Sequence, residues 1–154
     1  MLSILLSQCN IDGMFPVAYT LINSVRAPTD TVFAALTDPV RMPAWLPGCT
    51  DVQSGGPFQK GARFKVRFGA RQTEFEIVDF VRPWTFGWVE RGGRKGWKTF
   101  FRLDAVGGAT TITIRAVWIP HSFLAWLRGR LIEKRKGQRQ LEEILKNLQR
   151  VLAR

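Results

Sequence analysis

The sequence predicts an α+β domain in which a curved antiparallel β-sheet of six to seven strands wraps around one long C-terminal α-helix. Between Thr50 and Ile119, apolar and polar residues alternate with a period of two, which is typical of strands that bury one face. Glycine-rich turns interrupt this stretch at hairpin spacing. After Pro120 the hydrophobic period changes to about 3.6 residues, as in an amphipathic helix.

A chain of 154 residues has the usual size of one domain with one core. We expect this domain over residues 17–154, preceded by a poorly ordered extension over residues 1–16. The apolar start of the chain is too short for a signal-peptide core or a membrane span. The sequence has two cysteines and no C-x-x-C motif, which fits a reducing compartment. We therefore expect a cytoplasmic protein.

The first third of the chain predicts a strand followed by two short helices. Residues 17–26 read as a strand. Thr29 or Asp30 can cap a short helix over residues 31–37, because their side-chain oxygens accept hydrogen bonds from free helix N–H groups. A second short helical turn is expected over residues 40–46, before the next proline and glycine.

The following strands place apolar side chains on one face of the sheet and polar or basic side chains on the other. In residues 63–68, for example, phenylalanine and valine alternate with arginine and lysine. Such a sheet meets the core with one face and water with the other. The residues predicted to point inward are Phe64, Val66, Phe68, Phe75, Ile77, Phe86, Trp88, Trp97, Thr99, Phe101, Leu103, Ile112, Ile114, Ala116 and Trp118.

Residues 122–152 predict one amphipathic helix, roughly 45 Å long at about 1.5 Å per residue. A single helix cannot pack flat along a strongly twisted sheet, so the sheet must curl around it. The curl should leave a hollow lined by inward aromatic residues, which we expect to hold an apolar ligand. The apolar stripe of the helix consists of Leu124, Leu127, Leu131, Leu141, Leu145, Leu148 and Leu152.

The leucine stripe becomes polar for two turns, where its spacing reaches Lys134 and Gln138. Burying an unpaired cation is costly, so these side chains either meet a polar group or are not buried. One hypothesis is that both face the hollow and bind the polar head of an otherwise apolar ligand. The alternatives are that they extend to solvent or that they pair with an inward acid such as Glu90.

The predicted ligand site combines the inward aromatic residues, part of the helix stripe and Trp45, which we place in a loop at the mouth of the hollow. The eleven Phe and six Trp favour a ligand pocket, although an inward aromatic residue in a sheet is usually ordinary core. The predicted ligand-binding residues are Tyr19, Trp45, Phe64, Val66, Phe68, Phe75, Ile77, Phe86, Trp88, Trp97, Thr99, Phe101, Ile114, Trp118, Leu131, Lys134 and Gln138.

The sequence lacks the residue clusters that metal binding or common catalytic motifs require. His121 is the only histidine, which excludes a multi-histidine metal site, and Cys9 and Cys49 are too far apart for a zinc motif. No G-x-S-x-G, G-x-G-x-x-G or P-loop motif is present. We therefore predict no catalytic residue, no metal and no cofactor, and we place His121 in a loop at the entry to the C-terminal helix.

The net charge of +11 is concentrated in two segments. Residues 123–154 contain nine Lys or Arg against three Glu. A basic surface favours an anionic partner, either RNA or a membrane, and the alternative is a solvated face without a partner. Residues 123–127 are apolar and suit a membrane interface, but burial under neighbouring loops is the preferred interpretation. The other basic segment contributes Lys60, Arg63, Lys65, Arg67 and Arg71.

Six stretches in a fixed order carry a family resemblance: SVRAP (24–28), VFAALTDP (32–39), MPAWLPG (42–48), GARF (61–64), VDFVRP (78–83) and LEEILKNL (141–148). Over about residues 17–152 the chain resembles the SRPBCC superfamily, also called START-like or helix-grip proteins, which includes polyketide cyclase/dehydrase and lipid-transfer relatives. The resemblance implies a helix-grip fold with a deep hydrophobic cavity for lipids, polyketides or other apolar molecules. The superfamily includes enzymes, carriers and regulators, so fold alone does not fix the function.

We predict that the protein, as a monomer or homodimer, binds or carries an apolar small molecule. One alternative is a cyclase, aromatase or dehydrase that works mainly by positioning its substrate in the same cavity. Another is an interaction module whose basic surface contacts RNA, a ribosome or an anionic membrane. The candidate residues for the enzyme alternative are Tyr19, Glu90, Thr99, Lys134, Arg135 and Gln138.

Overall fold

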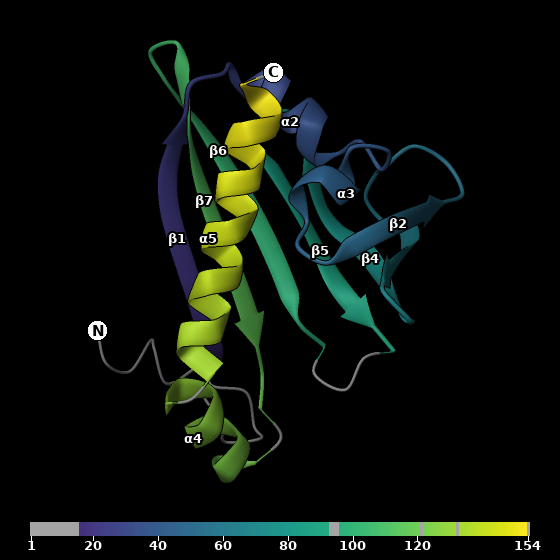
Figure 1. The fold of residues 1–154 in the computed structure, drawn as a ribbon, viewed down its shortest axis with the longest axis vertical. Coiled ribbons are helices and arrows are strands. Elements are labelled where there is room, and N and C mark those ends of the chain that lie inside the picture. Colours follow the sequence, from purple (N-terminus) through teal and green to yellow (C-terminus); the bar gives the residue numbers. More distant parts are fainter. Residues whose placement is uncertain (1–15, 93–95, 121, 132, 154) are drawn as a thin grey trace.

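The structure is a computed structural model that describes residues 16–92, 96–120, 122–131 and 133–153 (Figure 1). Residues 1–15 of the expected N-terminal extension, and His121, lie outside the described residues. In chain order the elements are β1 (Val17–Val25), α2 (Thr29–Leu36), α3 (Met42–Trp45), β2 (Cys49–Ser54), β3 (Arg63–Phe68), β4 (Arg71–Val81), β5 (Thr85–Arg91), β6 (Lys98–Val106), β7 (Ala109–Trp118), α4 (Phe123–Leu131) and α5 (Glu133–Leu152).

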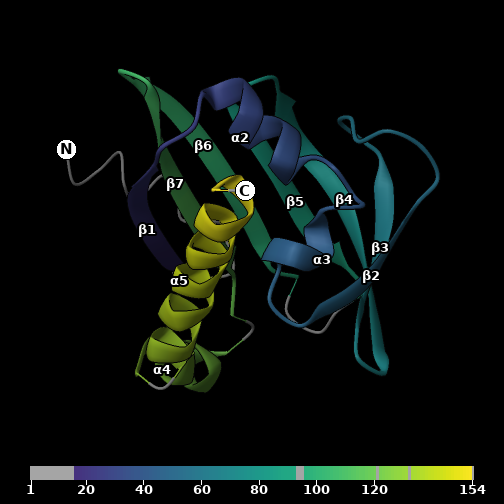
Figure 2. The same cartoon turned by 45° about the horizontal axis from the view of Figure 1, so that its top comes forward.

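The described strands form one antiparallel seven-stranded sheet in the order β1-β7-β6-β5-β4-β3-β2. Strands β2 to β7 pair with their neighbours in sequence. Strand β1 forms one edge of the sheet by pairing along β7, with Val17 opposite Trp118. The sheet curves around α5, and α2 and α3 lie on the same concave side (Figure 2). The predicted fold class, a curved antiparallel sheet gripping a C-terminal helix, is confirmed.

Two-residue turns connect β3 to β4 and β6 to β7. Gly69 and Gly107 begin these turns with φ values of +63° and +61°. This left-handed backbone region carries no steric cost for glycine, and it matches the twist of the flanking strands in tight hairpins. The glycine-containing turns in the sequence therefore located these hairpins correctly.

The period-two pattern also assigned the two faces of the sheet correctly. On β3, Phe64 and Val66 are 2% and 0% exposed, whereas Arg63 and Lys65 are exposed. Directly paired residues of antiparallel strands share a face, so each inward side chain continues a row across the sheet. The concave face is therefore apolar and the convex face is polar and basic.

The C-terminal region contains two helices, which corrects the expectation of one helix over residues 122–152. In α5, Leu141 and Leu148 are buried against the concave face. In α4, Leu124 and Leu131 are 76% and 68% exposed, although they continue the same leucine spacing. The leucine spacing does not reveal whether the region forms one helix or two. Because α4 packs separately from α5, its leucines point away from the sheet.

The helices cover the concave face unevenly. α5 runs along β1 and contacts α3 and α2 on its other side, while α4 lies beyond the start of α5, at the lower end of the molecule in Figure 1. None of the helices in the described residues combines the length and the hydropathy that crossing a bilayer requires.

Candidate functional site

The concave face between the sheet and the helices carries most of the side chains that the sequence assigned to a ligand site. Its centre is a cluster of aromatic rings, in which Trp88 lies 5.4 Å from Phe101 and 5.5 Å from Phe86, measured between ring centroids. These rings pack against one another across β5 and β6. The predicted ligand-binding residues that are buried are Tyr19, Trp45, Phe64, Val66, Phe75, Ile77, Phe86, Trp88, Phe101, Ile114 and Trp118.

Trp45 occupies the middle of this aromatic cluster, which corrects the prediction that it lies in a loop at the mouth of a hollow. It belongs to α3 and is fully buried. Its indole N–H donates to the Ala35 carbonyl at 3.2 Å, and its ring packs on Trp88 and Phe101 at centroid distances of 6.3 and 5.8 Å. The prolines around Trp45 suggested a loop, but the tertiary fold turns this short helix inward.

Phe58 is a member of the cluster that the sequence did not identify. Its ring lies 4.7 Å from that of Phe64 and 6.0 Å from that of Phe86, between centroids. Phe58 belongs to the connection between β2 and β3, where no hydrophobic period exists to mark an inward position. Its large aromatic side chain in an otherwise polar and glycine-rich loop was the available signal.

A second part of the concave face is only partly covered. We call it the inner-face row and define it as Glu90, Trp97, Thr99 and Ala116, all of which are half-buried. Thr99 lies opposite Ala116 of β7 and opposite the buried Trp88 of β5. Because directly paired residues share a face, the row lies on the concave side, next to the aromatic cluster.

The register of β4 and β5 places the carboxylate of this row. Glu90 lies opposite the buried Phe75 and follows Trp88 on the same face of β5. Glu90 and Thr99 therefore bring a carboxylate and a hydroxyl group to a surface that is otherwise formed by aromatic rings. From the sequence, Thr99 was predicted to bind the ligand and Glu90 was named as an inward acid that could pair with the polar helix residues. Both were also candidates for the enzyme alternative.

At one end of the row, Trp97 packs against two further aromatic side chains, Tyr19 and Trp118. The ring of Trp97 lies 5.7 Å from Tyr19 and 5.7 Å from Trp118. The Tyr19 hydroxyl donates a hydrogen bond to the Gly129 carbonyl of α4 at 3.0 Å. This contact ties α4 to the sheet and fixes the border of the row.

Lys134 does not take the inward position that the sequence assigned to it. Its side chain is exposed, even though it shares the helix stripe of Leu141 and Leu148. The stripe contacts the sheet from Gly137 onward, where the helix backbone meets Tyr19, and the first turn of α5 lies before this contact. Leu131 in α4 is likewise exposed.

Gln138 is half-buried, but it lies toward the edge strand and not toward the inner-face row. Gln149 follows about three turns later on nearly the same side of the helix, and its amide donates to the Ser24 carbonyl of β1 at 3.2 Å. The opposite side of α5 carries Asn147, whose amide donates to the Trp45 carbonyl at 3.2 Å. The structure therefore does not bring Lys134 and Gln138 together at the aromatic surface.

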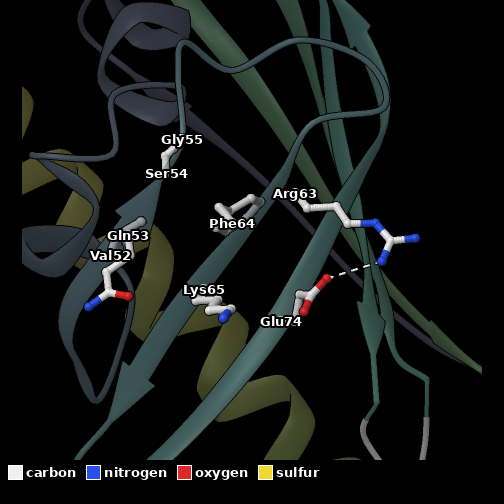
Figure 3. A pocket seen from close by; sticks show the side chains of 8 residues that line it. All are labelled: Val52, Gln53, Ser54, Gly55, Arg63, Phe64, Lys65 and Glu74. Atoms are coloured by element: carbon white, nitrogen blue, oxygen red, sulfur yellow. Dashed lines mark hydrogen bonds and ion pairs between the residues drawn. The ribbon is translucent and has the colours of Figure 1, made fainter.

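A groove of ≈ 580 Å³ lies elsewhere, along β2, β3 and the start of β4 (Figure 3). Its polar side chains include Lys65, Gln53 and Glu74, and Glu74 forms an ion pair with Arg63 at 3.2 Å. The groove is open and mixed in character. It is therefore a different kind of surface from the apolar hollow that the sequence predicted.

The basic segment over residues 60–71 lies beside this groove and is partly neutralised. Arg63 pairs with Glu74, and it also lies 4.0 Å from Glu76, which in turn pairs with Arg91 at 2.8 Å. Exposed ion pairs of this kind contribute little to stability, but they lower the local positive charge.

The described residues contain no group of three or more His, Cys, Asp or Glu side chains arranged to hold a metal ion. Cys49 at the start of β2 is buried, and burial raises the pKa of its thiol above the ordinary value. Its Sγ atom lies 3.8 Å from the Asp51 carbonyl. A buried thiol with a raised pKa is a poor nucleophile at neutral pH.

The comparison with known families decides how the chain is classified. A family model described as polyketide cyclase/dehydrase and lipid transport matches residues 19–153, nearly the whole described domain. The chain belongs to this polyketide cyclase/dehydrase and lipid transport family. The SRPBCC resemblance inferred from the sequence is therefore confirmed. No curated protein matches the sequence closely enough to add a more specific assignment.

Solved structures agree with the family assignment at the level of fold. DynU16, from the dynemicin biosynthetic locus, is 21% identical with a TM-score of 0.70, and the alignment covers 88% of this chain and 47% of DynU16. The Aha1 dimer structure from Colwellia psychrerythraea is 19% identical with a TM-score of 0.70, covering 88% and 96%. Ara h 8.0201 is 12% identical with a TM-score of 0.72, covering 90% and 99%.

These neighbours differ widely in the names they carry, and this family member spans about half of the DynU16 chain. At such low identity the likeness shows a shared helix-grip fold and no shared activity. The family assignment is consistent with the binding of hydrophobic ligands.

Proposed function

We propose that the protein binds and carries an apolar small molecule, such as a lipid or a polyketide, on the concave face of its sheet. The observation that carries this proposal is the inner-face row, where Trp97, Thr99 and Ala116 remain partly exposed beside the aromatic cluster. Apolar surface that is left partly open beside packed rings is favourable for an apolar guest, because binding removes that surface from water. The family description supports the same reading.

The polar groups of the row restrict the ligand class. Glu90 supplies a carboxylate and Thr99 a hydroxyl group, both at the rim of the aromatic surface. A ligand with an apolar body and a hydroxyl or amino group at one end could satisfy both side chains. We therefore assign the polar end of the ligand to Glu90 and Thr99, in place of the Lys134 and Gln138 pair expected from the sequence.

The packing of the aromatic cluster limits how a large ligand can enter the site. The aromatic cluster beside the row is closely packed around Trp45, so a large ligand must displace side chains of α3 or settle along the row itself. Side-chain rearrangement on binding is common even where the backbone moves little. We infer that the row receives the ligand first and that Trp45 sets how deeply it can enter.

Native mass spectrometry of the full chain, isolated without detergent, tests this proposal. We expect an additional mass that organic extraction releases and identifies as an apolar molecule. Titration with a fluorescent lipophilic probe supplies a second measurement when the endogenous molecule is lost in purification. A clean mass of the protein alone, together with no binding of the probe, would contradict the proposed function.

A further inference from the structure

The orientation of α4 is fixed by a glycine that faces the protein. A Cβ atom placed on Gly129 would lie 2.8 Å from the Trp118 ring and 3.5 Å from Val17, so this side of the helix packs directly on β7 and β1. The Gly129 carbonyl also accepts the hydrogen bond from Tyr19. Ala125 and Trp126, which flank Gly129 around the helix, are half-buried.

The opposite side of α4 is apolar and points away from the protein. At about 100° per residue, four large apolar side chains share the direction opposite to Gly129. We call them the outward face of α4. They are Phe123, Leu124, Leu127 and Leu131, which are 61%, 76%, 37% and 68% exposed. The preferred interpretation from the sequence, burial of residues 123–127 under neighbouring loops, is therefore wrong for Phe123, Leu124 and Leu127.

Cations border this outward face on both sides. Arg128 lies along one edge of it and Arg130 along the other, at about 80° from its centre. The Arg130 guanidinium lies 5.3 Å from the centre of the Trp126 ring. The first turns of α5 continue the positive charge, because residues 123–139 contain six Lys or Arg and one Glu.

We propose that α4 docks the protein on an anionic lipid bilayer, lying in the interface with its outward face against the acyl chains. An apolar helix face bordered by cations is the pattern that binds such an interface, since leucines enter the acyl boundary while arginines reach the lipid phosphates. RNA is a poorer match, because three of the four outward side chains are leucines, which offer its bases neither stacking nor hydrogen bonds. The apolar outward face together with its bordering cations thus selects the bilayer surface.

The size of α4 agrees with a surface position. Its nine residues span roughly 14 Å, about half of the hydrocarbon thickness of a bilayer. α4 lies at one end of the molecule (Figure 1), and the four side chains of its outward face are exposed. The proposal concerns α4 and the first turns of α5, and it does not depend on which ligand, if any, the concave face binds.

Sedimentation with vesicles tests the docking surface. The full chain is mixed with vesicles of phosphatidylcholine and phosphatidylserine, or of phosphatidylcholine alone. We expect the wild-type protein to sediment with the mixed vesicles and to lose binding as salt rises. The double variant Leu124→Ser and Leu131→Ser should bind at least about tenfold more weakly, because it removes two exposed apolar side chains from the interface.

Two further double variants separate the apolar contribution to vesicle binding from the electrostatic one. Ile22→Ser with Val106→Ser removes two similarly exposed apolar residues of strands β1 and β6, outside α4, and it should bind like the wild type. Arg128→Gln with Arg135→Gln should lower binding to the mixed vesicles by about an order of magnitude. All three variants alter exposed side chains, and circular dichroism with thermal unfolding verifies that each one folds.

Three results would overturn the proposal. The wild-type protein could fail to bind the mixed vesicles, or the Leu124→Ser, Leu131→Ser variant could bind them as tightly as the wild type. Sedimentation velocity without lipid could also show a dimer that this variant abolishes, which would make a second copy of the chain the occupant of the outward face. RNA that binds the wild type and this variant equally would contact the cations and not the outward face, which supports the assignment of that face to the bilayer.

Discussion

Gly137 of α5 lies directly on the ring of Tyr19 of β1. A side chain at position 137 would overlap the Cδ2 and Cε2 atoms of that ring. Tyr19 is 3% exposed, and its side chain is held in place. Its hydroxyl group donates a hydrogen bond to the Gly129 carbonyl of α4, and its ring stacks on Trp97. The two C-terminal helices therefore approach the sheet through two glycines that share one tyrosine.

Substitution of Gly137 by alanine should destabilise the protein. Alanine favours an α-helix over glycine by about 1 kcal/mol, but the overlap with a fixed ring should cost about 1–3 kcal/mol more than that gain. Chemical denaturation measures the net change in the free energy of unfolding. The matched control is Gln140→Ala at an exposed position of the same helix, which should change stability by less than about 0.5 kcal/mol.

A double-mutant cycle identifies the contact responsible. In a Tyr19→Leu background, Gly137→Ala should be neutral or stabilising, because the obstructing ring is absent. If the cost of Gly137→Ala is the same in both backgrounds, the contact with Tyr19 does not explain it.

Trp45→Ala should be among the most destabilising single substitutions in the chain. Trp45 is fully buried, packs on two other rings and hydrogen-bonds to Ala35. Removing such a side chain typically costs about 3–5 kcal/mol, part of it from the cavity that remains. Trp84, at 46% exposure, provides the control, and its substitution by alanine should cost far less in the same denaturation measurement. Equal losses would show that Trp45 is not central to the core.

Filling the inner-face row should block ligand binding without unfolding the protein. Thr99→Trp places a large side chain on the concave face, where we expect the affinity for a lipophilic probe to fall at least about tenfold. The control is Thr113→Trp on the convex face of the neighbouring strand, which should leave the affinity unchanged. Fluorescence titration of both variants gives the comparison. Unaltered probe binding by Thr99→Trp would remove the row from the proposed site.

Cys49 should make stability fall at alkaline pH. Burial raises the pKa of its thiol in the folded state, so the unfolded thiol loses its proton first as the pH passes its ordinary value of about 8.5. Above that pH the unfolded state binds fewer protons, and the free energy of unfolding decreases. The Cys49→Ala variant should lack this component, which denaturation curves at several pH values reveal. Parallel pH profiles for the two proteins would argue against a raised pKa.

The strand faces could be predicted well because side-chain direction in a strand is a local property. Phe64, Val66 and Phe101 lie inward as their alternation with basic residues indicated. Trp45 and Phe58 could not be placed in this way. Both belong to short or irregular segments without a hydrophobic period, and their burial depends on how these segments fold back onto the sheet.

Two polar residues show another limit of prediction from the sequence. Lys134 shares the stripe of Leu141 but is exposed, whereas the helix backbone meets Tyr19 of the sheet at Gly137. The inward direction of Glu90 follows from its spacing to Trp88, but its position opposite Phe75 depends on the register of β4 and β5, which a single sequence does not specify at long range.

The sequence by itself indicated the family, through six stretches in a fixed order. It also determined the sheet with its two faces and the amphipathic C-terminal region, since these two follow from hydrophobic periods that each segment carries alone. Only the tertiary structure decided that this region forms two helices, that Leu124 and Leu131 point outward, and that Trp45 fills the centre. The physical reason is that leucine spacing defines a stripe on a helix, whereas the direction in which the stripe faces depends on which side packs on the sheet. In α4 that side is set by Gly129, whose missing side chain allows the closest approach.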